Sequence, residues 1–267
     1  MGIVNVTPDS FSDGGLFLEP ERAVAHGRRL LEEGADILDV GGESTRPGAE
    51  PVPAAIELER TAPVIAQLAG SGATVSIDTS KARVAGAALD AGATIVNDVT
   101  ALRGDPELAA LCAERTCEVI LMHMRGSPRT MQDAPVYHDV VDEVRAFLAA
   151  RIEAATAAGI DEQRIWIDPG IGFGKTTVHN LELLRRLGRL CELGRPVVVG
   201  SSRKRFLGAL TGREVDERLG GTIASSVLAL AHGAEVLRVH EVLAARRALD
   251  VTEVILGRRR WDAAAMS

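Results

Sequence analysis

The feature that most constrains the fold of this chain is a unit that recurs along it. In each copy a helical stretch ends at a glycine, three or four mainly apolar residues follow, and a polar residue closes the unit. The glycine suits the left-handed backbone position at which helices commonly end. The short runs of Val and Ile are typical of strands buried on both faces. Four segments follow the pattern closely, at residues 32–42, 70–80, 90–100 and 231–240.

The rest of the chain completes a regular alternation of strands and helices. Further strands are predicted at 2–7, 117–123, 164–170 and 195–202. Amphipathic helices are predicted at 20–34, 54–69, 81–91, 106–115, 139–158, 178–192, 215–232 and 240–256. Eight strands alternating with eight helices in about 250 residues predict an α/β fold, the (β/α)8 TIM barrel. A doubly wound open sheet is the alternative.

The chain shows no internal boundary. Neither a shift in composition nor a linker rich in Pro, Gly or Ser divides it. We therefore expect a single barrel domain over residues 1–257. The segment 258–267 lacks an apolar stripe and is expected to form a frayed tail.

Composition narrows the classes of function. The 267 residues are 46% hydrophobic and carry a formal net charge of −7, which argues against a nucleic-acid partner. Aromatic residues make up only 3%, so few side chains could stack on bases. The three cysteines have no metal-binding spacing, which favours a reducing compartment. We see no secretory signal and no apolar run of about 18 residues. The sequence thus predicts a cytoplasmic protein with no membrane partner.

In a TIM barrel, ligands meet the carboxyl ends of the strands, and in this sequence nearly all of those ends are polar. The simple alternative is that polar residues merely end strands or cap the following helix, as the stretch DTSK at 78–81 could do. The residues are Asn5, Asp39, Asp78, Asn97, Asp98, His123, Asp168, Ser201, Ser202, Arg238 and His240.

Two kinds of chemistry are represented at these ends. The carboxylates of Asp78 and Asp168 and the amide of Asn97 can form hydrogen bonds with a flat heterocycle that offers adjacent N–H donors and a carbonyl. Basic and hydroxyl side chains could gather an anion such as diphosphate. These are Thr45, Arg46, Arg203, Lys204, Arg238 and His240. No histidine pair has metal spacing, and no serine lies in a nucleophile elbow.

The stretch DPGIGFGKT at 168–176 ends like a phosphate-binding P-loop. A P-loop requires Gly, four residues, and then Gly-Lys-Ser/Thr. Counting back from Gly174, the first glycine position falls on Pro169, which has no backbone N–H to offer a phosphate. The spacing therefore argues against a nucleotide site.

Taken together, the motifs resemble those of the dihydropteroate synthase family. They occur in order over nearly the whole chain, and eight motifs in order are highly specific. They are NVTPDSFSDGG at 5–15, GGESTRPG at 41–48, IDTSK at 77–81, NDV at 97–99, LMHMRGSPRTMQ at 121–132, DPGIGFGKT at 168–176, GSSRKRFLG at 200–208 and RVHEV at 238–242.

The resemblance implies a TIM barrel and a transferase of folate biosynthesis that is the target of sulfonamides. It would join 6-hydroxymethyl-7,8-dihydropterin diphosphate to para-aminobenzoate and release pyrophosphate, with Mg²⁺ as cofactor and a homodimer as the assembly. Asp78, Lys204 and Arg46 would be catalytic. The pterin would be held by Asp78, Asn97, Met122, Asp168, Gly200 and Lys204. The diphosphate would be held by Thr45, Arg46, Arg238, Val239 and His240.

The resemblance also implies where the second substrate and the metal lie. Asn5 would be a ligand of Mg²⁺, which is otherwise coordinated mostly by phosphate oxygens and water. In the stretch DPGIGFGKT, Asp168 would face the pterin and Phe173 the aryl ring, and Lys175 would only be a neighbour. Para-aminobenzoate would contact Phe173 and the start of a helix after Lys204. The residues implied for it are Pro47, Phe173, Lys204 and Arg205.

Two alternatives from other functional classes stay open on the sequence. A pterin-binding methyltransferase barrel would keep Asp78, Asn97 and Asp168, but it has no need of the STRPG and SRK segments. A non-catalytic relative could bind pterin without turnover. No motif is lost in a way that favours this second alternative.

Overall fold

The computed structural model describes residues 1–7, 20–44, 48–127 and 129–260. The described strands follow one another along the chain with at least one helix between each pair of neighbours. They are β1 (Gly2–Asn5), β2 (Ile37–Gly41), β3 (Thr74–Asp78), β4 (Ile95–Asp98), β5 (Glu118–Met122), β6 (Ile165–Asp168), β7 (Val198–Val199) and β8 (Val236–Leu237).

The strands close into a barrel. β1 to β6 form one parallel sheet in sequence order, and β7 pairs with β8 in a second parallel sheet. Two isolated bridges join these sheets: Ile167 pairs with Val197 on one side, and Gly2 pairs with Val239 on the other. Because the last strand returns to the first, the described strands leave no open sheet edge, and the predicted TIM barrel is confirmed over the doubly wound open sheet.

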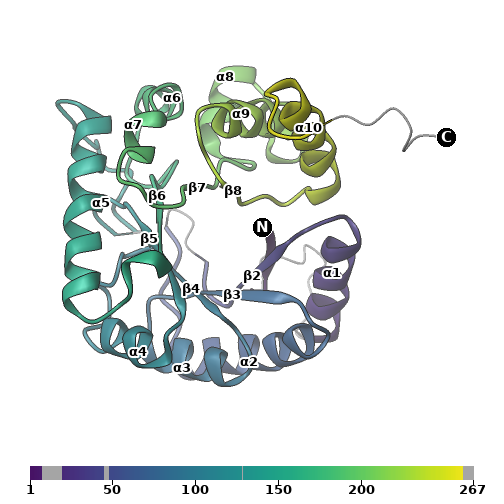
Figure 1. Cartoon of the computed structure of the whole chain (residues 1–267), viewed down its shortest axis with the longest axis vertical. Coiled ribbons are helices and arrows are strands. Elements are labelled where there is room, and N and C mark those ends of the chain that lie inside the picture. Colours follow the sequence, from purple (N-terminus) through teal and green to yellow (C-terminus); the bar gives the residue numbers. More distant parts are fainter. Residues whose placement is uncertain (8–19, 45–47, 128, 261–267) are drawn as a thin grey trace.

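Helices surround the strands on all sides (Figure 1). They are α1 (Pro20–Glu32), α2 (Ala54–Gly70), α3 (Ala82–Asp90), α4 (Leu108–Arg115), α5 (Val140–Ala157), α6 (Thr177–Arg185), α7 (Gly188–Cys191), α8 (Arg205–Thr211), α9 (Leu219–Ala231) and α10 (Val242–Ile255). Short 3-10 turns occur at Glu162–Arg164 and Val215–Glu217.

The predicted helices differ from the observed ones at two places. The single helix predicted over 178–192 is interrupted, and its second part, α7, is only four residues long. Helix α8, between β7 and α9, is absent from the helices predicted by periodicity, because seven residues are too few to show a helical period. Only the family resemblance implied a helix after Lys204, and the structure confirms it. It matters for function, since α8 begins directly after Lys204 at the carboxyl end of β7.

Alternation along the strands separates an apolar layer from a polar one inside the barrel. Ile95, Ile120 and Val198 pack with Met1 in a buried cluster that also contacts Trp166. Successive side chains of a strand point to opposite faces, so the residue two positions later faces the same way. Asn97, Met122 and Asp168 therefore lie above this cluster, at the carboxyl ends of their strands, while Val96, Leu121 and Ile167 belong to the main core.

The segment predicted to form a frayed tail, 258–267, is partly bonded to the barrel. Arg258 donates to the carbonyl of Leu230, and Arg259 forms an ion pair with Asp250. The first part of the predicted tail is thus bonded to α9 and α10, and residues 261–267 lie outside the described part.

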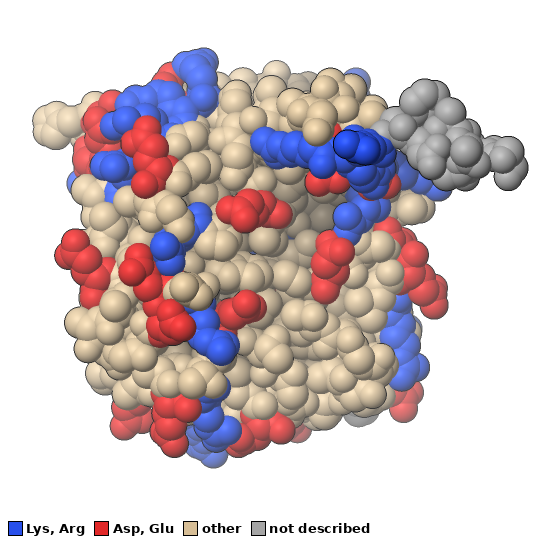
Figure 2. All heavy atoms as spheres, in the orientation of Figure 1, with Lys and Arg blue, Asp and Glu red and all other residues tan. Residues whose placement is uncertain are grey.

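None of the described helices has the length and hydropathy to cross a membrane. Acidic and basic side chains are interspersed on the face shown in Figure 2.

Candidate active site

The strand ends bring the predicted pterin residues together. In the parallel register Asp78 lies opposite Asn97, and Met122 lies opposite Asp168. Asn5, the predicted metal ligand, ends β1 opposite Gly41 and is half-buried. These residues come from separate strands, and the sheet itself fixes their backbone positions. The carboxyl end of the barrel is therefore a polar, preorganised surface.

Arg238, which follows β8, bonds to carboxylates of both β2 and β3. Its Nε lies 2.6 Å from the Asp39 carboxylate, and its Nη2 lies 2.9 Å from that of Asp78. The side-chain amide of Asn97 donates to the same oxygen of Asp39 at 3.1 Å. We call Asp39, Asp78, Asn97 and Arg238 the Arg238 cluster.

Burial shifts the acid–base equilibria in this cluster. It raises the pKa of the Asp78 carboxyl to about 7, against the opposing pull of Arg238. Burial also acts to lower the pKa of Arg238, but the carboxylates of Asp39 and Asp78 outweigh it and the net pKa is raised. The guanidinium therefore stays charged and can meet an anion.

Asp39 is a functional residue that the sequence analysis placed at a strand end but gave no role. Its side chain is 0% exposed, and one carboxylate oxygen accepts from both Arg238 and Asn97. The other oxygen has no hydrogen-bond partner among the described residues. A buried carboxylate at this position orients the guanidinium and the amide. An aspartate two residues before a strand end, pointing into the barrel, was the signal that could have identified it.

Asp168 ends β6 and is almost completely buried. Burial raises the pKa of its carboxyl to about 6, while the Gly170 N–H, which it accepts at 2.6 Å, and the charge of Lys204 oppose the rise. Helix α6 is capped by Thr176, not by Asp168. The N-cap residue of α3 is Lys81, whose side chain makes no capping hydrogen bond, and the first N–H of the helix, that of Ala82, donates to Asp105 at 2.8 Å. The Asp78 carboxylate accepts instead from Arg238. Within the described residues, the helix-cap alternative for Asp78 and Asp168 is thus excluded.

Next to Asp168 lies a small apolar cluster that contains two predicted site residues. Met122 and Phe173 are buried together with Val99, Met124 and Met131. The ammonium of Lys204 lies 4.0 Å above the centre of the Phe173 ring. This cation–π contact joins a residue predicted for the pterin to one predicted for the aryl substrate.

The remaining residues near β7 have distinct environments. Arg205 is the first residue of α8 and is exposed to solvent. Gly200 follows β7, and a Cβ atom built there would make only ordinary contacts, with the side chain of Arg238. Space within the chain alone therefore does not require glycine at position 200.

The histidine of the predicted anion site is held by a serine that the sequence analysis did not assign. Ser202 Oγ lies 2.9 Å from Nδ1 of His240 and accepts from the His240 backbone N–H at 3.2 Å. The backbone of Val239 bonds to the start of the chain on both sides. Its N–H donates to the Met1 carbonyl, and its carbonyl accepts from the Ile3 N–H. Val239 thus fixes the strand from which Arg238 and His240 extend.

The stem of the loop after β2 is held by ion pairs. Lys81 Nζ binds the carboxylate of Glu43 and, at 2.5 Å, that of Glu57, whose side chain is 1% exposed. Burial acts to lower the pKa of Lys81, but these two carboxylates outweigh it and raise it. Three predicted site residues follow this stem and lie outside the described residues: Thr45, Arg46 and Pro47.

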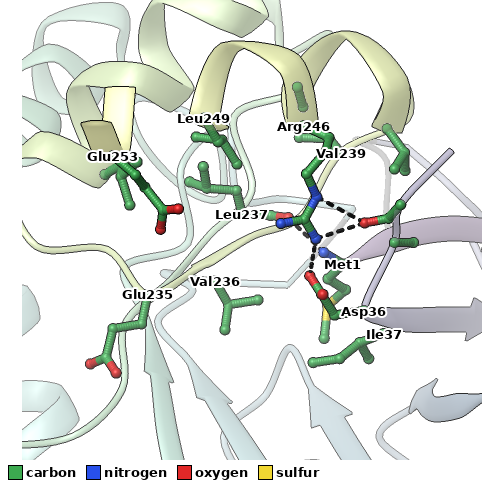
Figure 3. Close-up of a pocket in the computed structure, with 15 residues that line it drawn as sticks. Met1, Asp36, Ile37, Glu235, Val236, Leu237, Val239, Arg246, Leu249 and Glu253 are labelled. Carbon is green, nitrogen blue, oxygen red and sulfur yellow. Dashed lines mark hydrogen bonds and ion pairs between the residues drawn. The ribbon is translucent and has the colours of Figure 1, made fainter. Parts of the chain in front are cut away.

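A cavity of about 130 Å³ lies at the opposite end of the barrel. Figure 3 shows that Met1, Ile37 and Val236, at the amino ends of β1, β2 and β8, line it together with side chains of α10. Arg246 closes one side through its ion pair with Asp36. Because ligands of TIM barrels bind at the carboxyl ends of the strands, we do not assign the substrates to this cavity.

With the geometry in place, comparison with known proteins identifies the family. The sequence model of the pterin-binding enzymes matches residues 1–240. The chain is 50% identical over 258 residues to dihydropteroate synthase of Mycobacterium leprae (strain TN), covering 94% of this chain and 91% of the relative. It is 44% identical over 257 residues to that of Synechocystis sp. (strain ATCC 27184 / PCC 6803 / Kazusa), covering 96% and 89%.

Solved structures agree with the sequence relatives. Dihydropteroate synthase of Xanthomonas albilineans with 4-aminobenzoic acid has a TM-score of 0.90 and 54% identity, covering 96% of this chain and 92% of that one. The Yersinia pestis enzyme in a sulfonamide drug complex has a TM-score of 0.92 and 41% identity, covering 96% and 93%. The chain belongs to the dihydropteroate synthase family of pterin-binding enzymes.

Proposed function

We propose that the protein condenses 6-hydroxymethyl-7,8-dihydropterin diphosphate with para-aminobenzoate to give 7,8-dihydropteroate and pyrophosphate. The amine nitrogen of para-aminobenzoate forms a bond to the pterin methylene carbon, the carbon–oxygen bond to the diphosphate breaks, and the amine loses a proton. The observation that carries the proposal is the Arg238 cluster, which places a half-buried guanidinium beside the buried carboxylates of Asp39 and Asp78 in a chain of this family.

The pterin ring is assigned to the strand ends. Asp168 and Asp78 offer carboxylate acceptors to the ring N–H groups, and Asn97 offers an amide. Met122 supplies an apolar wall beside them, since it is buried in the small apolar cluster that also contains Phe173. Two further residues at the end of β7 complete the proposed pterin set: Gly200 and Lys204.

The diphosphate is assigned to the cations at the end of β8. Arg238 is charged and oriented by Asp39, so its guanidinium is ready to stabilise negative charge that grows on the leaving group. Ser202 orients His240 for the same anion. Thr45, Arg46 and Val239 complete the proposed diphosphate set.

Para-aminobenzoate is assigned to the space beside Phe173. The ring of Phe173 can stack on the aryl ring. Lys204 and Arg205 lie at the start of α8, where positive charge suits the carboxylate of this substrate. Pro47 is included from the family motif.

Mg²⁺ fits as a cofactor that the substrate itself largely holds. No group of three acidic, His or Cys side chains that could hold a metal occurs among the described residues. A single amide oxygen from Asn5 suits an ion that keeps diphosphate oxygens and water as its other ligands. Bound there, Mg²⁺ would neutralise charge on the leaving diphosphate.

Three residues are proposed as catalytic. Asp78 stabilises the electron-poor methylene that is left as the diphosphate departs. Lys204 and Arg46 provide positive charge near the pterin and the leaving group. An aryl amine is uncharged near neutral pH and is already a nucleophile, so the reaction needs no strong general base.

The test is a coupled assay for pyrophosphate. We expect release that requires both para-aminobenzoate and Mg²⁺ and that stops when the metal is chelated. Calorimetry with the pterin alone separates the alternatives. A pterin-binding methyltransferase or a non-catalytic relative would bind the pterin without releasing pyrophosphate, and that result would overturn the proposal.

We also propose that the protein is a cytoplasmic homodimer. The three cysteines are free thiols, which fits a reducing compartment. Helices α9 and α10, which pack on one another, expose the large apolar side chains of Leu228, Val251 and Ile255. Light scattering coupled to gel filtration tests the assembly: a mass of one chain at micromolar concentration would contradict it.

A further inference from the structure

Lys175, the lysine of the P-loop-like stretch, is buried at the carboxyl end of the barrel with 3% of its surface exposed. Its Nζ lies 2.8 Å from Nδ1 of His123, 2.9 Å from the carbonyl of Phe173, 3.0 Å from that of Gly170 and 3.2 Å from that of His123. Its N–H donors are therefore taken up inside the protein. A phosphate could bind them only by displacing carbonyls of the loop.

These contacts join two separate strand ends. The carbonyl and the ring of His123 belong to the residue after β5, whereas Gly170 and Phe173 lie in the loop after β6. Burial and the charge of Lys175 lower the pKa of His123 to about 2, so its imidazole stays neutral and Nδ1 can accept. Burial likewise lowers the pKa of Lys175. A polar group is retained in such a place only where its hydrogen bonds are satisfied.

The loop from Gly170 to Gly174 depends on side chains for its shape. Besides the carbonyls that Lys175 binds, that of Gly172 accepts from Gln132 Nε2 at 2.7 Å, and that of Gly174 accepts from the Tyr137 hydroxyl at 2.8 Å. The glycines themselves have positive φ angles of 65°, 84° and 64°. No strand ladder holds this backbone, so the side-chain donors set its path.

Of the two substrate residues, Asp168 lies before the loop and Phe173 lies within it, so they are held in different ways. Asp168 is paired within the sheet to Met122, and its carbonyl accepts from the His123 N–H at 3.0 Å. Phe173 lies five residues beyond the strand end, and Lys175 binds its carbonyl directly. Loss of Lys175 should consequently displace Phe173 and leave Asp168 in place.

We infer that Lys175 is a positioning residue for the aryl substrate: it anchors the Phe173 backbone to His123 and so builds the para-aminobenzoate side of the site. The inference rests on the proposed function. It differs from a purely structural role because it predicts a selective effect on one of the two substrates.

The test is Lys175→Met in the full chain, with pyrophosphate release measured against each substrate in turn. Removing the donors leaves buried carbonyls without partners, so we expect the KM for para-aminobenzoate to rise about tenfold or more. The KM for the pterin diphosphate should stay within about twofold. Arg151→Met is the matched control: its Nε donates at 2.8 Å to the carbonyl of Ala101, in the loop after β4, and both KM values should stay unchanged.

If Lys175→Met does not fold, a second variant, Tyr137→Phe, tests whether the loop after β6 positions the aryl substrate. Tyr137→Phe removes only the hydroxyl that binds the Gly174 carbonyl, and it should raise the KM for para-aminobenzoate by a smaller factor with no change for the pterin. An equal rise in both KM values, or no rise in either, would overturn the inference. Wild-type turnover establishes the proposed function separately, so a wild-type protein without activity would count against that proposal and not against this one.

Discussion

The two halves of the candidate site are built on different kinds of backbone. The half proposed for pterin and diphosphate stands on strand ends, where the Arg238 cluster links β2, β3, β4 and β8. The half proposed for the aryl substrate stands on the loop after β6, which Lys175 and Tyr137 hold by its carbonyls. The sheet hydrogen bonds fix the position of a residue at a strand end, whereas the backbone of the loop is held by side-chain donors that bind its carbonyls.

This difference suits the two substrates. The pterin presents several donors and acceptors in fixed geometry, and recognition of that pattern gains from groups that cannot move. The aryl ring presents mainly a flat apolar face, which Phe173 and Lys204 can meet from a loop and a helix start. Perturbing the strand-end half should therefore affect stability and affinity together, and perturbing the loop half should affect mainly the affinity for one substrate.

The largest effect is expected for Arg238→Met. It leaves the fully buried carboxylate of Asp39 and that of Asp78 without their cation, and breaking a buried ion pair costs about 3–5 kcal/mol. We expect the free energy of unfolding, measured by urea denaturation, to fall by about that amount. Arg213→Met is the control, because that side chain is exposed and should change stability by less than about 0.5 kcal/mol.

A double variant sharpens this test. Adding Asp39→Asn to Arg238→Met removes the charge that was left unpaired, so part of the lost stability should return. If the double variant is as unstable as the sum of the single ones, Asp39 and Arg238 are not energetically coupled. The strand-end half would then not be one electrostatic unit.

A smaller effect is expected for Asp168→Asn. A hydrogen bond to a charged group contributes about 1.5–3 kcal/mol, so pterin affinity should weaken by roughly one to two decades. Titration calorimetry with 6-hydroxymethylpterin measures this directly. Unchanged affinity would show that Asp168 does not bind the pterin. Asp78 and Asn97 would then be the strand-end residues left to recognise the ring.

The next prediction concerns pH and separates affinity from stability. The pKa of Asp168 is raised to about 6, so protonation below that pH should weaken pterin binding, by up to about tenfold per pH unit. The free energy of unfolding changes in the opposite direction. Because the pKa of Asp168 is higher in the folded protein, its contribution to stability is fully present at a pH below the ordinary pKa of an aspartate and is lost as the pH rises through about 6. Comparing wild type with Asp168→Asn by calorimetry and thermal unfolding between pH 4 and 8 tests both signs; parallel pH profiles in the two proteins would contradict both.

The strand-end half was largely predictable from the sequence. The strands are short, four of them follow a glycine that ends a helix, and most are closed by a polar residue. The pattern that predicts the barrel therefore also predicts which side chains meet at the carboxyl ends of its strands. Asp78, Asn97, Asp168 and Arg238 lie at these ends. Asp39 was given no role, because its importance lies in contacts to residues 58 and 199 positions away in the sequence.

The loop half was predicted less completely, for a physical reason. Besides Lys175, the side chains that donate to the loop after β6 are those of Gln132 and Tyr137, and no periodicity relates their segment to the loop that it contacts. From the sequence, Lys175 was expected to be only a neighbour of the substrate site. The structure shows instead that its Nζ is bonded to groups of three residues. Helix α8 was expected only from the family resemblance, since its seven residues carry no visible period.

The smallest effect is expected where the sequence most resembles a nucleotide site. We predict that the free protein has no ATP site at DPGIGFGKT. Pro169 offers no N–H, and Lys175, buried and bonded to loop carbonyls, cannot extend to a phosphate. A triphosphate could still meet Arg238 through its charge, so titration of Mg-ATP must be repeated with saturating Mg²⁺-pyrophosphate present. We expect any heat of binding to disappear under that competition. ATP binding that survives it would place a phosphate site in the loop after β6. It would also show that this loop can release Lys175, against the view that its shape is fixed by that side chain.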